Sequence, residues 1–281
     1  MQTIRSIDEM INKINLINKE GKTIGFVPTM GFLHIGHKSL IDAARKENEV
    51  VVVSVFVNPT QFGPKEDFEA YPRSEEKDSL LCLKAGCDIM FIPECAEMYD
   101  EGYNTYIEVN DLTEGLCGAS RPGHFRGVCT VVLKLFNIVK PQRAYFGQKD
   151  AQQLAVIKKM IKDLNLNVEV LGCPIVREFD GLAMSSRNTY LNKDERLQAL
   201  VLYKSLDKVR ELIENGEHTT MILKEEMKKI ISSAKDSSID YIEIVDNLSL
   251  KAIEVINKEV LIAIAVKIGR TRLIDNMVVN I

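Results

Sequence analysis

Two histidines three residues apart suggest the clearest chemistry in this sequence. His34 and His37 lie in the segment His-Ile-Gly-His, at the expected start of a helix, so their rings share one face. The intervening Gly36 lets another group approach the backbone closely. Backbone N–H groups at a helix N-terminus attract phosphate, and imidazoles can donate further hydrogen bonds to it. We therefore predict a triphosphate site at this segment.

Two other interpretations of the histidine pair stay open at this point. Both rings could be partly exposed structural side chains beside a turn. A metal site is the second alternative, and it is weakened because His124 and His218 are the other two histidines of the chain. The sequence also lacks the His-Glu-x-x-His arrangement of many zinc sites.

Cationic and hydroxyl side chains gather in two later segments. Lys149 follows a predicted strand and can neutralise phosphate, while Asp150 beside it suits a helix cap, a ribose or a magnesium-bound water. Ser185, Ser186 and Arg187 could surround the β- and γ-phosphates of a nucleotide. A simple helix cap with a solvated lysine, and an interdomain linker, are the corresponding structural alternatives.

Two glutamines are candidates for binding a substrate that carries a hydroxyl beside a carboxylate. Gln61 lies in Asn58 to Arg73, a long connection without helical periodicity, and such connections are often functional. Its amide both donates and accepts hydrogen bonds. Gln153, three residues after Asp150, should point from the first helical turn toward the same place. For both, binding to a neighbouring turn or backbone group is the alternative.

All of these segments begin near the end of a predicted strand. The expected strands of the first part are Thr23–Pro28, Val50–Val57, Asp88–Ile92, Ala144–Phe146 and Val168–Val176. The expected helices around them are one opened by Ser6 and others at Gly36–Glu47, Ser74–Ala85, Arg126–Lys140 and Asp150–Asp163. This alternation predicts an α/β fold, a Rossmann-like parallel sheet with helices on both faces. Ligands bind at the carboxyl ends of such strands, so the segments should converge.

The last third of the chain changes pattern and predicts a smaller α+β domain. Two long amphipathic helices are expected at Lys193–Asn215 and Thr220–Ala234. Three strands are expected at Ile239–Val245, Glu259–Lys267 and Arg272–Asp275. We place the domain boundary near residues 180 to 188, which gives domains 1–180 and 181–281.

Composition narrows the function classes further. The 281 residues carry 36 Lys and Arg against 40 Asp and Glu, a net charge of −4, and no Trp, which disfavours nucleic acid as a partner. No apolar stretch approaches the ~20 residues of a membrane span, and acidic Asp8 and Glu9 do not fit a signal peptide. We expect a cytoplasmic protein whose six cysteines are reduced and bind no metal.

The strand, glycine turn and His-Ile-Gly-His resemble the nucleotidyltransferase superfamily, with Ser185 to Arg187 in place of its mobile Lys-Met-Ser-Lys-Ser loop. Taken in order, further motifs make the chain similar to one family within it, the pantoate–β-alanine ligases (pantothenate synthetases). These motifs are Pro28-Thr29-Met30-Gly31, Asn58-Pro59-Thr60-Gln61-Phe62-Gly63, Tyr71-Pro72-Arg73, Arg121-Pro122-Gly123-His124-Phe125-Arg126-Gly127, Tyr145-Phe146-Gly147-Gln148-Lys149-Asp150, Met184-Ser185-Ser186-Arg187-Asn188, Asp240-Tyr241-Ile242-Glu243 and Arg272-Leu273-Ile274-Asp275-Asn276.

The resemblance implies an ATP-dependent, homodimeric ligase that joins pantoate to β-alanine through pantoyl adenylate, with Mg²⁺ on the phosphates and the mobile loop and second domain as a lid. It implies that His37, His34 and Lys149 are catalytic and that Gln61 and Gln153 bind pantoate, with Gln61 also at β-alanine. The implied ATP-binding residues are Met30, Gly31, Phe32, Leu33, His34, Ile35, Gly36, His37, Gly147, Gln148, Lys149, Asp150, Val176, Met184, Ser185, Ser186 and Arg187.

Two points stay open. Arg121, His124 and Arg126 could stand beside the active site or support packing. An ATP-sensing module, and a relative that transfers adenylate to another acceptor, are the rival functions.

Overall fold

Two compact units make up the computed structural model, which describes residues 1–64 and 66–280. Unit 1 consists of Met1–Asn110, Arg121–Gln148 and Gln153–Pro174, and unit 2 of Asp111–Ser120, Lys149–Gln152 and Ile175–Ile281. Two short segments from the middle of the chain thus belong to unit 2. The division of the chain into domains 1–180 and 181–281 stays a prediction.

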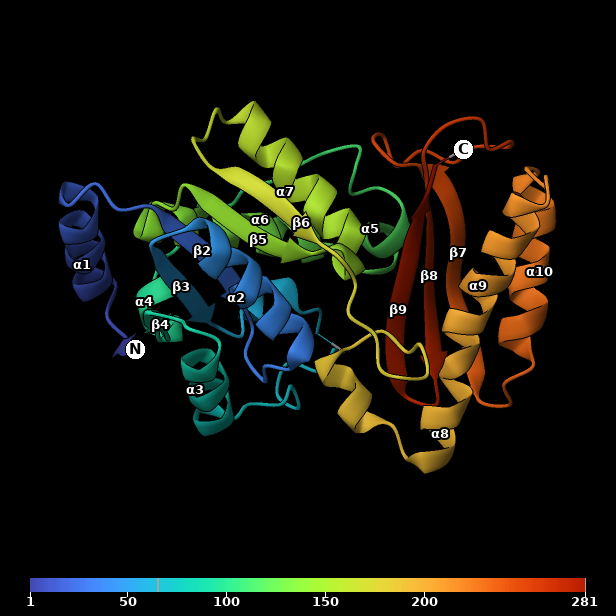
Figure 1. Cartoon of the computed structure of the whole chain (residues 1–281), viewed down its shortest axis with the longest axis horizontal. Coiled ribbons are helices and arrows are strands. Elements are labelled where there is room, and N and C mark those ends of the chain that lie inside the picture. The colour runs from blue at the N-terminus through green and yellow to red at the C-terminus, as the bar shows by residue number, and fades with distance from the viewer. Residues whose placement is uncertain (65, 281) are drawn as a thin grey trace. The chain divides into compact units, whose positions relative to one another are not determined.

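Unit 1 is built on a parallel six-stranded sheet, visible in Figure 1. The strand order is β1-β4-β3-β2-β5-β6. The strands are β1 Gln2–Ile4, β2 Ile24–Thr29, β3 Val50–Val55, β4 Ile89–Phe91, β5 Arg143–Gly147 and β6 Glu169–Cys173. β2 pairs with β3 on one side and with β5 on the other, so the strand order reverses at β2. Ligands of open α/β sheets bind beyond the carboxyl ends of the strands at such a reversal.

Helices cover both faces of this sheet because its strands are apolar on both sides. The helices of this part are α1 Ile7–Lys19, α2 Ile35–Glu47, α3 Glu75–Lys84, α4 Cys95–Met98, α6 His124–Val139 and α7 Ala151–Asp163. Val27 and Val51 pack with Ile41 of α2 on one face. On the other, the Phe26 ring meets Phe136 of α6 edge-on, with centroids 6.3 Å apart. Alternate residues of β2 thus serve opposite cores.

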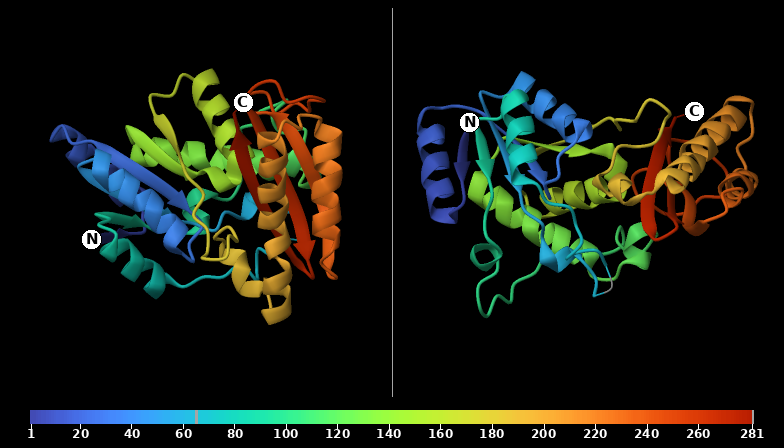
Figure 2. Two further views of the ribbon diagram at one scale, coloured as in Figure 1. Left: turned by 45° about the vertical axis from the view of Figure 1, so that its right-hand side comes forward. Right: turned by 90° about the horizontal axis from the view of Figure 1, so that it is seen from below.

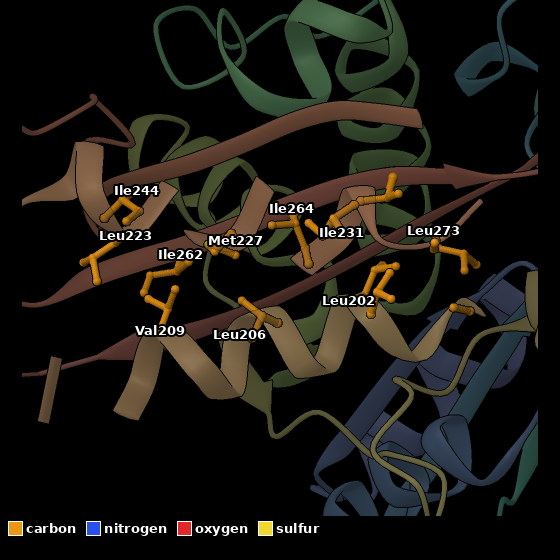
Figure 3. Close-up of a cluster of buried hydrophobic side chains, with 14 of the residues drawn as sticks. Leu202, Leu206, Val209, Leu223, Met227, Ile231, Ile244, Ile262, Ile264 and Leu273 are labelled. Carbon is orange, nitrogen blue, oxygen red and sulfur yellow. The ribbon is translucent and has the colours of Figure 1, made fainter. Parts of the chain in front are cut away.

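Unit 2 is an antiparallel three-stranded sheet covered by two long helices. Its strands are β7 Ser237–Asp246, β8 Val260–Ile268 and β9 Thr271–Val279, in the order β7-β8-β9. Its helices are α5 Leu116–Ser120, α8 Lys193–Gln198, α9 Leu200–Glu214 and α10 Thr220–Ser232. Figure 2 shows α9 and α10 side by side against the sheet. In Figure 3, Leu206 of α9 and Met227 of α10 lie with Ile262 and Ile264 of β8 in one core.

The predicted fold class is confirmed, with corrections at several elements. The single helix expected at Lys193–Asn215 is wrong: Ala199 separates α8 from α9, and there the Leu202 N–H bonds back three residues to the Ala199 carbonyl. The strand expected to reach Val176 ends at Cys173, because Pro174 has no N–H to donate to a neighbouring strand. β1, α4 and α5 are too short to show a periodic pattern, and the sequence does not predict them. The strand expected at Arg272–Asp275 is longer and runs from Thr271 to Val279.

Among the described residues, none of the helices combines the length with the apolar character that a membrane crossing requires.

Two methionines on α10 allow a matched test of the core of unit 2. Met227 is completely buried, whereas Met221 is 70% exposed. We expect Met227→Ala to lower the free energy of unfolding by about 2–5 kcal/mol, because it leaves a cavity between helix and sheet. Met221→Ala on the same helix should cost less than about 0.5 kcal/mol. Urea denaturation followed by circular dichroism measures both values, and similar losses would contradict this assignment of the buried face.

Candidate active site

The chain turns sharply after β2, at the point where the strand order reverses. Gly31 has φ +83° and Phe32 has φ +52°, so two successive residues adopt left-handed backbone. A Cβ on Gly31 would lie 2.9 Å from Val55 Cγ1 and 3.0 Å from Asp78 Oδ2. Only glycine tolerates both this φ and this close packing without strain. The Gly31 N–H also donates to Thr29 Oγ1 at 3.2 Å, which tightens the turn.

The carboxylate of Asp78, on α3, stabilises this turn with two hydrogen bonds. It accepts the N–H of Phe32 at 2.9 Å on Oδ2 and the N–H of Leu33 at 2.6 Å on Oδ1. Asp78 is 1% exposed, and this burial raises its pKa above the ordinary value, although the two N–H donors oppose the rise. Hydrogen bonds to a charged acceptor are stronger than those to a neutral one. Asp78 therefore fixes the backbone that leads into His34.

His34 and His37 form a reciprocal cap at the start of α2. His34 Nδ1 accepts the N–H of Gly36 at 3.1 Å, and His37 Nδ1 accepts the N–H of His34 at 3.2 Å. The two ring centroids are 4.1 Å apart. Because each Nδ1 is an acceptor, each neutral ring carries its proton on Nε2.

This cap modifies one expectation about the phosphate site. The Gly36 N–H is engaged by His34, so it is not available to a phosphate as the sequence suggested. The Nε2 protons of the two rings and the dipole of α2 are the attractive features that this helix start offers to an anion.

Gln61 lies in the same unit, in a one-turn helix of residues Pro59–Gln61 after β3. Its side chain is buried, with Nε2 2.8 Å from Met30 Sδ and Oε1 accepting from Asn58 Nδ2 at 3.2 Å. The predicted proximity of Gln61 to the turn after β2 is thus present within unit 1. Asn58 also donates to the carbonyl of Gly127 at 3.1 Å, which joins the loop to α6.

Arg121 and His124 support the backbone of Gln61, which settles part of the question left open by the sequence. The Gln61 carbonyl accepts from His124 Nδ1 at 2.8 Å and from an Arg121 terminal nitrogen at 3.3 Å. Arg121 also binds both oxygens of Glu66 at 2.7 Å. Burial raises the pKa of Glu66, but the hydrogen bonds and charge of Arg121 outweigh it and the net pKa is lowered. Arg126 instead stacks on the ring of Tyr106, at 4.0 Å.

The remaining predicted residues of unit 1 lie on β5 and α7. Gly147 is the last residue of β5, and Gln148 follows it directly. Gln153 lies in the first turn of α7 and is half-buried. Ile35 and Gly36 begin α2, as expected.

Unit 2 carries the predicted cations and hydroxyls. Lys149 and Asp150 lie in a short turn, Gln148–Asp150, directly before α7. Val176 and Met184 face each other across a hairpin, where the Met184 N–H donates to the Val176 carbonyl at 2.9 Å. Ser185 caps the one-turn helix Ser186–Tyr190 by accepting the Arg187 N–H at 3.3 Å, so its hydroxyl proton can still be donated. Ser186 is buried.

Asn58 and Asp78 are site residues that the sequence did not single out. In the sequence, Asn58 is only the first residue of a motif and has no assigned role. The Asn-Pro pair is the signal that could have marked it as a turn cap. Asp78 lies in an acidic helix start, where Asp is common, and no local signal separates it from Glu75 or Glu76.

The sheet order and the histidine cap at the reversal of β2 define a Rossmann-like α/β protein. The pantoate-beta-alanine ligase family model matches residues 2–278. The chain belongs to the pantoate–β-alanine ligase family, and it is an enzyme of the amide-forming ligase class.

Relatives and solved structures agree with this assignment. The chain is 60% identical to pantothenate synthetase of Clostridium novyi over 99% of this chain and 98% of that protein. It is 59% identical to that of Thermosipho melanesiensis over the whole of both. The crystal structure of pantothenate synthetase from Thermus thermophilus matches with TM-score 0.94 and 44% identity over 99% of both chains. The pantoate-beta-alanine ligase of Francisella tularensis, solved with β-γ ATP and β-alanine, matches with TM-score 0.81 and 35% identity over 99% of this chain and 97% of that one.

We expect Asp78→Asn to weaken the turn after β2. The amide keeps the shape of the carboxylate but replaces one acceptor oxygen with a donor that faces a backbone N–H, which should cost about 1–3 kcal/mol of stability. Activity should fall with it. Asp42→Asn, which removes an exposed partner of Lys38, is the matched control and should cost less than about 0.5 kcal/mol. Thermal unfolding and steady-state rates compare the two, and equal effects would show that Asp78 does not support the turn.

Proposed function

We propose that this enzyme condenses pantoate with β-alanine to give pantothenate, using ATP and forming pantoyl adenylate as an intermediate. The family assignment, and the β-γ ATP and β-alanine bound in the Francisella structure, support this proposal. The proposal includes the cytoplasmic location and the homodimer expected from the sequence.

Activation of the acid is the chemical reason for using ATP. A carboxylate oxygen is a poor leaving group, so the pantoate carboxylate first attacks the α-phosphorus of ATP. The bond from that phosphorus to the bridging oxygen breaks, and pyrophosphate leaves. The β-alanine amine then attacks the acyl carbon, the bond to AMP breaks, and the nitrogen loses a proton to give the amide. No covalent bond to the enzyme is needed.

The reciprocal cap of His34 and His37 is the observation that carries this proposal. It consumes both Nδ1 atoms and so places the protons on Nε2. Negative charge grows on the α-phosphate oxygens and on pyrophosphate in the first step, and fixed hydrogen-bond donors stabilise it without reorganising. The cap provides such fixed donors at the sheet's reversal point.

In the proposal, Lys149, Ser185, Ser186 and Arg187 bind the β- and γ-phosphates of ATP. Ammonium and guanidinium groups offset the polyphosphate charge, and hydroxyls donate to its oxygens. Gln61 and Gln153 hold pantoate, with Gln61 also near β-alanine. The residues framing adenosine are Met30, Gly31, Phe32, Leu33, Gly147 and Val176.

Magnesium fits this donor set when it is carried mainly by the nucleotide. Among residues 1–64 and 66–280, no group of three His, Cys, Asp or Glu side chains could hold a metal ion by itself. Mg²⁺ usually binds through substrate phosphates, waters and one or two carboxylates. The exposed carboxylate of Asp150, beside Lys149, is suited to a magnesium-bound water. Bound there, the ion would offset charge on the phosphate oxygens.

Isotope exchange between pyrophosphate and ATP tests the proposed function. The exchange requires reversible adenylate formation, so we expect it to depend on added pantoate and to proceed without β-alanine. If exchange requires a different acid, that acid and not pantoate is the substrate, and the proposal is wrong. ATP binding with no exchange under any acid would favour the ATP-sensing alternative.

Two substitutions of His37 separate its two roles. Asn has an oxygen near the position of Nδ1, so His37→Asn can keep the cap while it removes the Nε2 donor, whereas His37→Ala removes both. We expect both variants to lower pantoate-dependent exchange by about two orders of magnitude. His37→Ala alone should also lower the melting temperature. An exchange rate close to wild type in His37→Asn would remove the Nε2 donor from the mechanism.

Lys149→Ala should slow the first step more than the second. The ammonium group opposes charge on pyrophosphate, which is absent once the adenylate has formed, so we expect a loss of about 10²-fold in exchange. Amide formation from preformed pantoyl adenylate and β-alanine should change little. Lys158→Ala, an exposed lysine on α7, is the control. Equal losses in both steps would contradict the role given to Lys149.

A further inference from the structure

Two adjacent residues of β9 each fasten one of the segments of unit 2 to which we assign ATP phosphates. Asn276 Nδ2 donates to the Lys149 carbonyl at 2.7 Å. Asp275 accepts from both terminal nitrogens of Arg177, at the base of the hairpin that leads to Ser185. We propose that Asp275 and Asn276 are positioning residues that set the distance between Lys149 and the Ser185–Arg187 loop for the adenylation step. This inference rests on the proposed function.

The link on the first side of β9 is a two-pronged ion pair. Arg177 reaches Asp275 at 2.6 Å and 3.0 Å, and the Asp275 side chain is only 1% exposed. The Asn276 N–H donates to Asp275 Oδ1 at 2.8 Å, which orients the carboxylate. A two-pronged guanidinium–carboxylate contact restricts both distance and rotation. Arg177 therefore cannot shift along the strand without losing a contact.

Arg177 in turn fixes the hairpin before the Ser185–Arg187 loop. It donates to the Gly181 carbonyl at 3.0 Å and pairs with Ala183 across the hairpin. Its guanidinium stacks 5.0 Å from the ring centre of Tyr203 on α9. Gly181, at φ +97°, lies so close to this ring that a Cβ would be 2.1 Å from it. The hairpin is thus held between β9 and α9.

The link on the second side of β9 holds the segment Lys149–Gln152. Asn276 is buried, and its amide supplies the donor that the Lys149 carbonyl needs. Three residues further along, Gln152 donates to the carbonyls of Leu112 and Gly115 and accepts the Cys117 N–H. The short segment Lys149–Gln152 is therefore held by hydrogen bonds at both of its ends.

The pleat of β9 explains how one strand serves both segments. Successive side chains of a strand point to opposite faces. Leu273 and Asp275 share the face toward α9, whereas Arg272, which contacts Cys117, shares the other face with Asn276. β9 therefore lies between the hairpin and the Lys149 segment and fixes the distance between them. Misplacing a charged group by about 1 Å can cost 10²-fold in rate, so this spacing should matter most where both groups act on ATP.

Asn276→Leu and Arg177→Lys test this inference in the full-length enzyme. Leucine keeps the shape of asparagine without a donor, and lysine keeps the charge of arginine without the two-pronged contact. We expect each variant to raise KM for ATP and to lower pantoate-dependent exchange by about 10-fold or more. Amide formation from preformed pantoyl adenylate should stay within about two-fold of wild type.

Thr220→Val is the matched structural control. Thr220 is buried in the same unit, and its hydroxyl donates to the carbonyls of Ile253 and Glu254, in a loop without predicted site residues. Thr220→Val should lower the melting temperature by about as much as Asn276→Leu does, and it should leave the rate of pyrophosphate–ATP exchange unchanged. Exchange rates of Asn276→Leu and Arg177→Lys that match Thr220→Val, or equal losses in both steps, would overturn the inference. A wild-type enzyme without exchange would instead overturn the proposed function, and the inference with it.

Discussion

The site in unit 1 depends on a left-handed turn that the backbone would not adopt without support. Phe32 has positive φ, a conformation that costs a non-glycine residue about 1 kcal/mol or more, and Gly31 precedes it in the same region. The buried carboxylate of Asp78 offsets this cost with two hydrogen bonds to consecutive N–H groups. The turn places His34 at the N-cap position of α2, where it can form the reciprocal cap with His37. The carboxylate on α3 thereby supports the backbone on which the two histidine rings cap the helix.

Unit 2 solves an equivalent problem with a strand. The segments that carry Lys149 and Arg187 lie outside the strands of unit 2, and polar side chains of β9 bind the first segment and the base of the hairpin before the second. In both units many of the groups that would touch the substrate lie on turns or at helix starts, whereas Asp78, Asp275 and Asn276, which hold these segments, lie on regular elements and are buried. This division has a physical reason: a loop must leave its functional atoms exposed to the substrate, so its stability has to come from partners on the other side of its backbone.

Most elements could be predicted from the sequence because their signals are local. Apolar β-branched runs gave β2 and β3 to within two residues, and helical periodicity gave α2 and α7 nearly to the residue. The histidine segment could be placed at a helix start for the same reason, since spacing alone puts both rings on one face. Prediction failed where the controlling contact was distant. Ala199 belongs to an uninterrupted helical pattern, so the sequence does not reveal that α8 ends and α9 begins beside this fully buried residue.

The supporting residues escaped prediction for a reason that sequence separation makes plain. Asp78 lies 46 residues from Phe32, Asp275 lies 98 from Arg177, and Asn276 lies 127 from Lys149. An Asp in the first turn of a helix and an Asp-Asn pair in a strand have ordinary local explanations, and nothing in their neighbours reveals a distant backbone carbonyl or N–H. The candidate site residues include combinations that are rare elsewhere, such as paired histidines, and so are visible in a sequence. Positioning groups are common residues in unusual places, and the fold is what makes the place unusual.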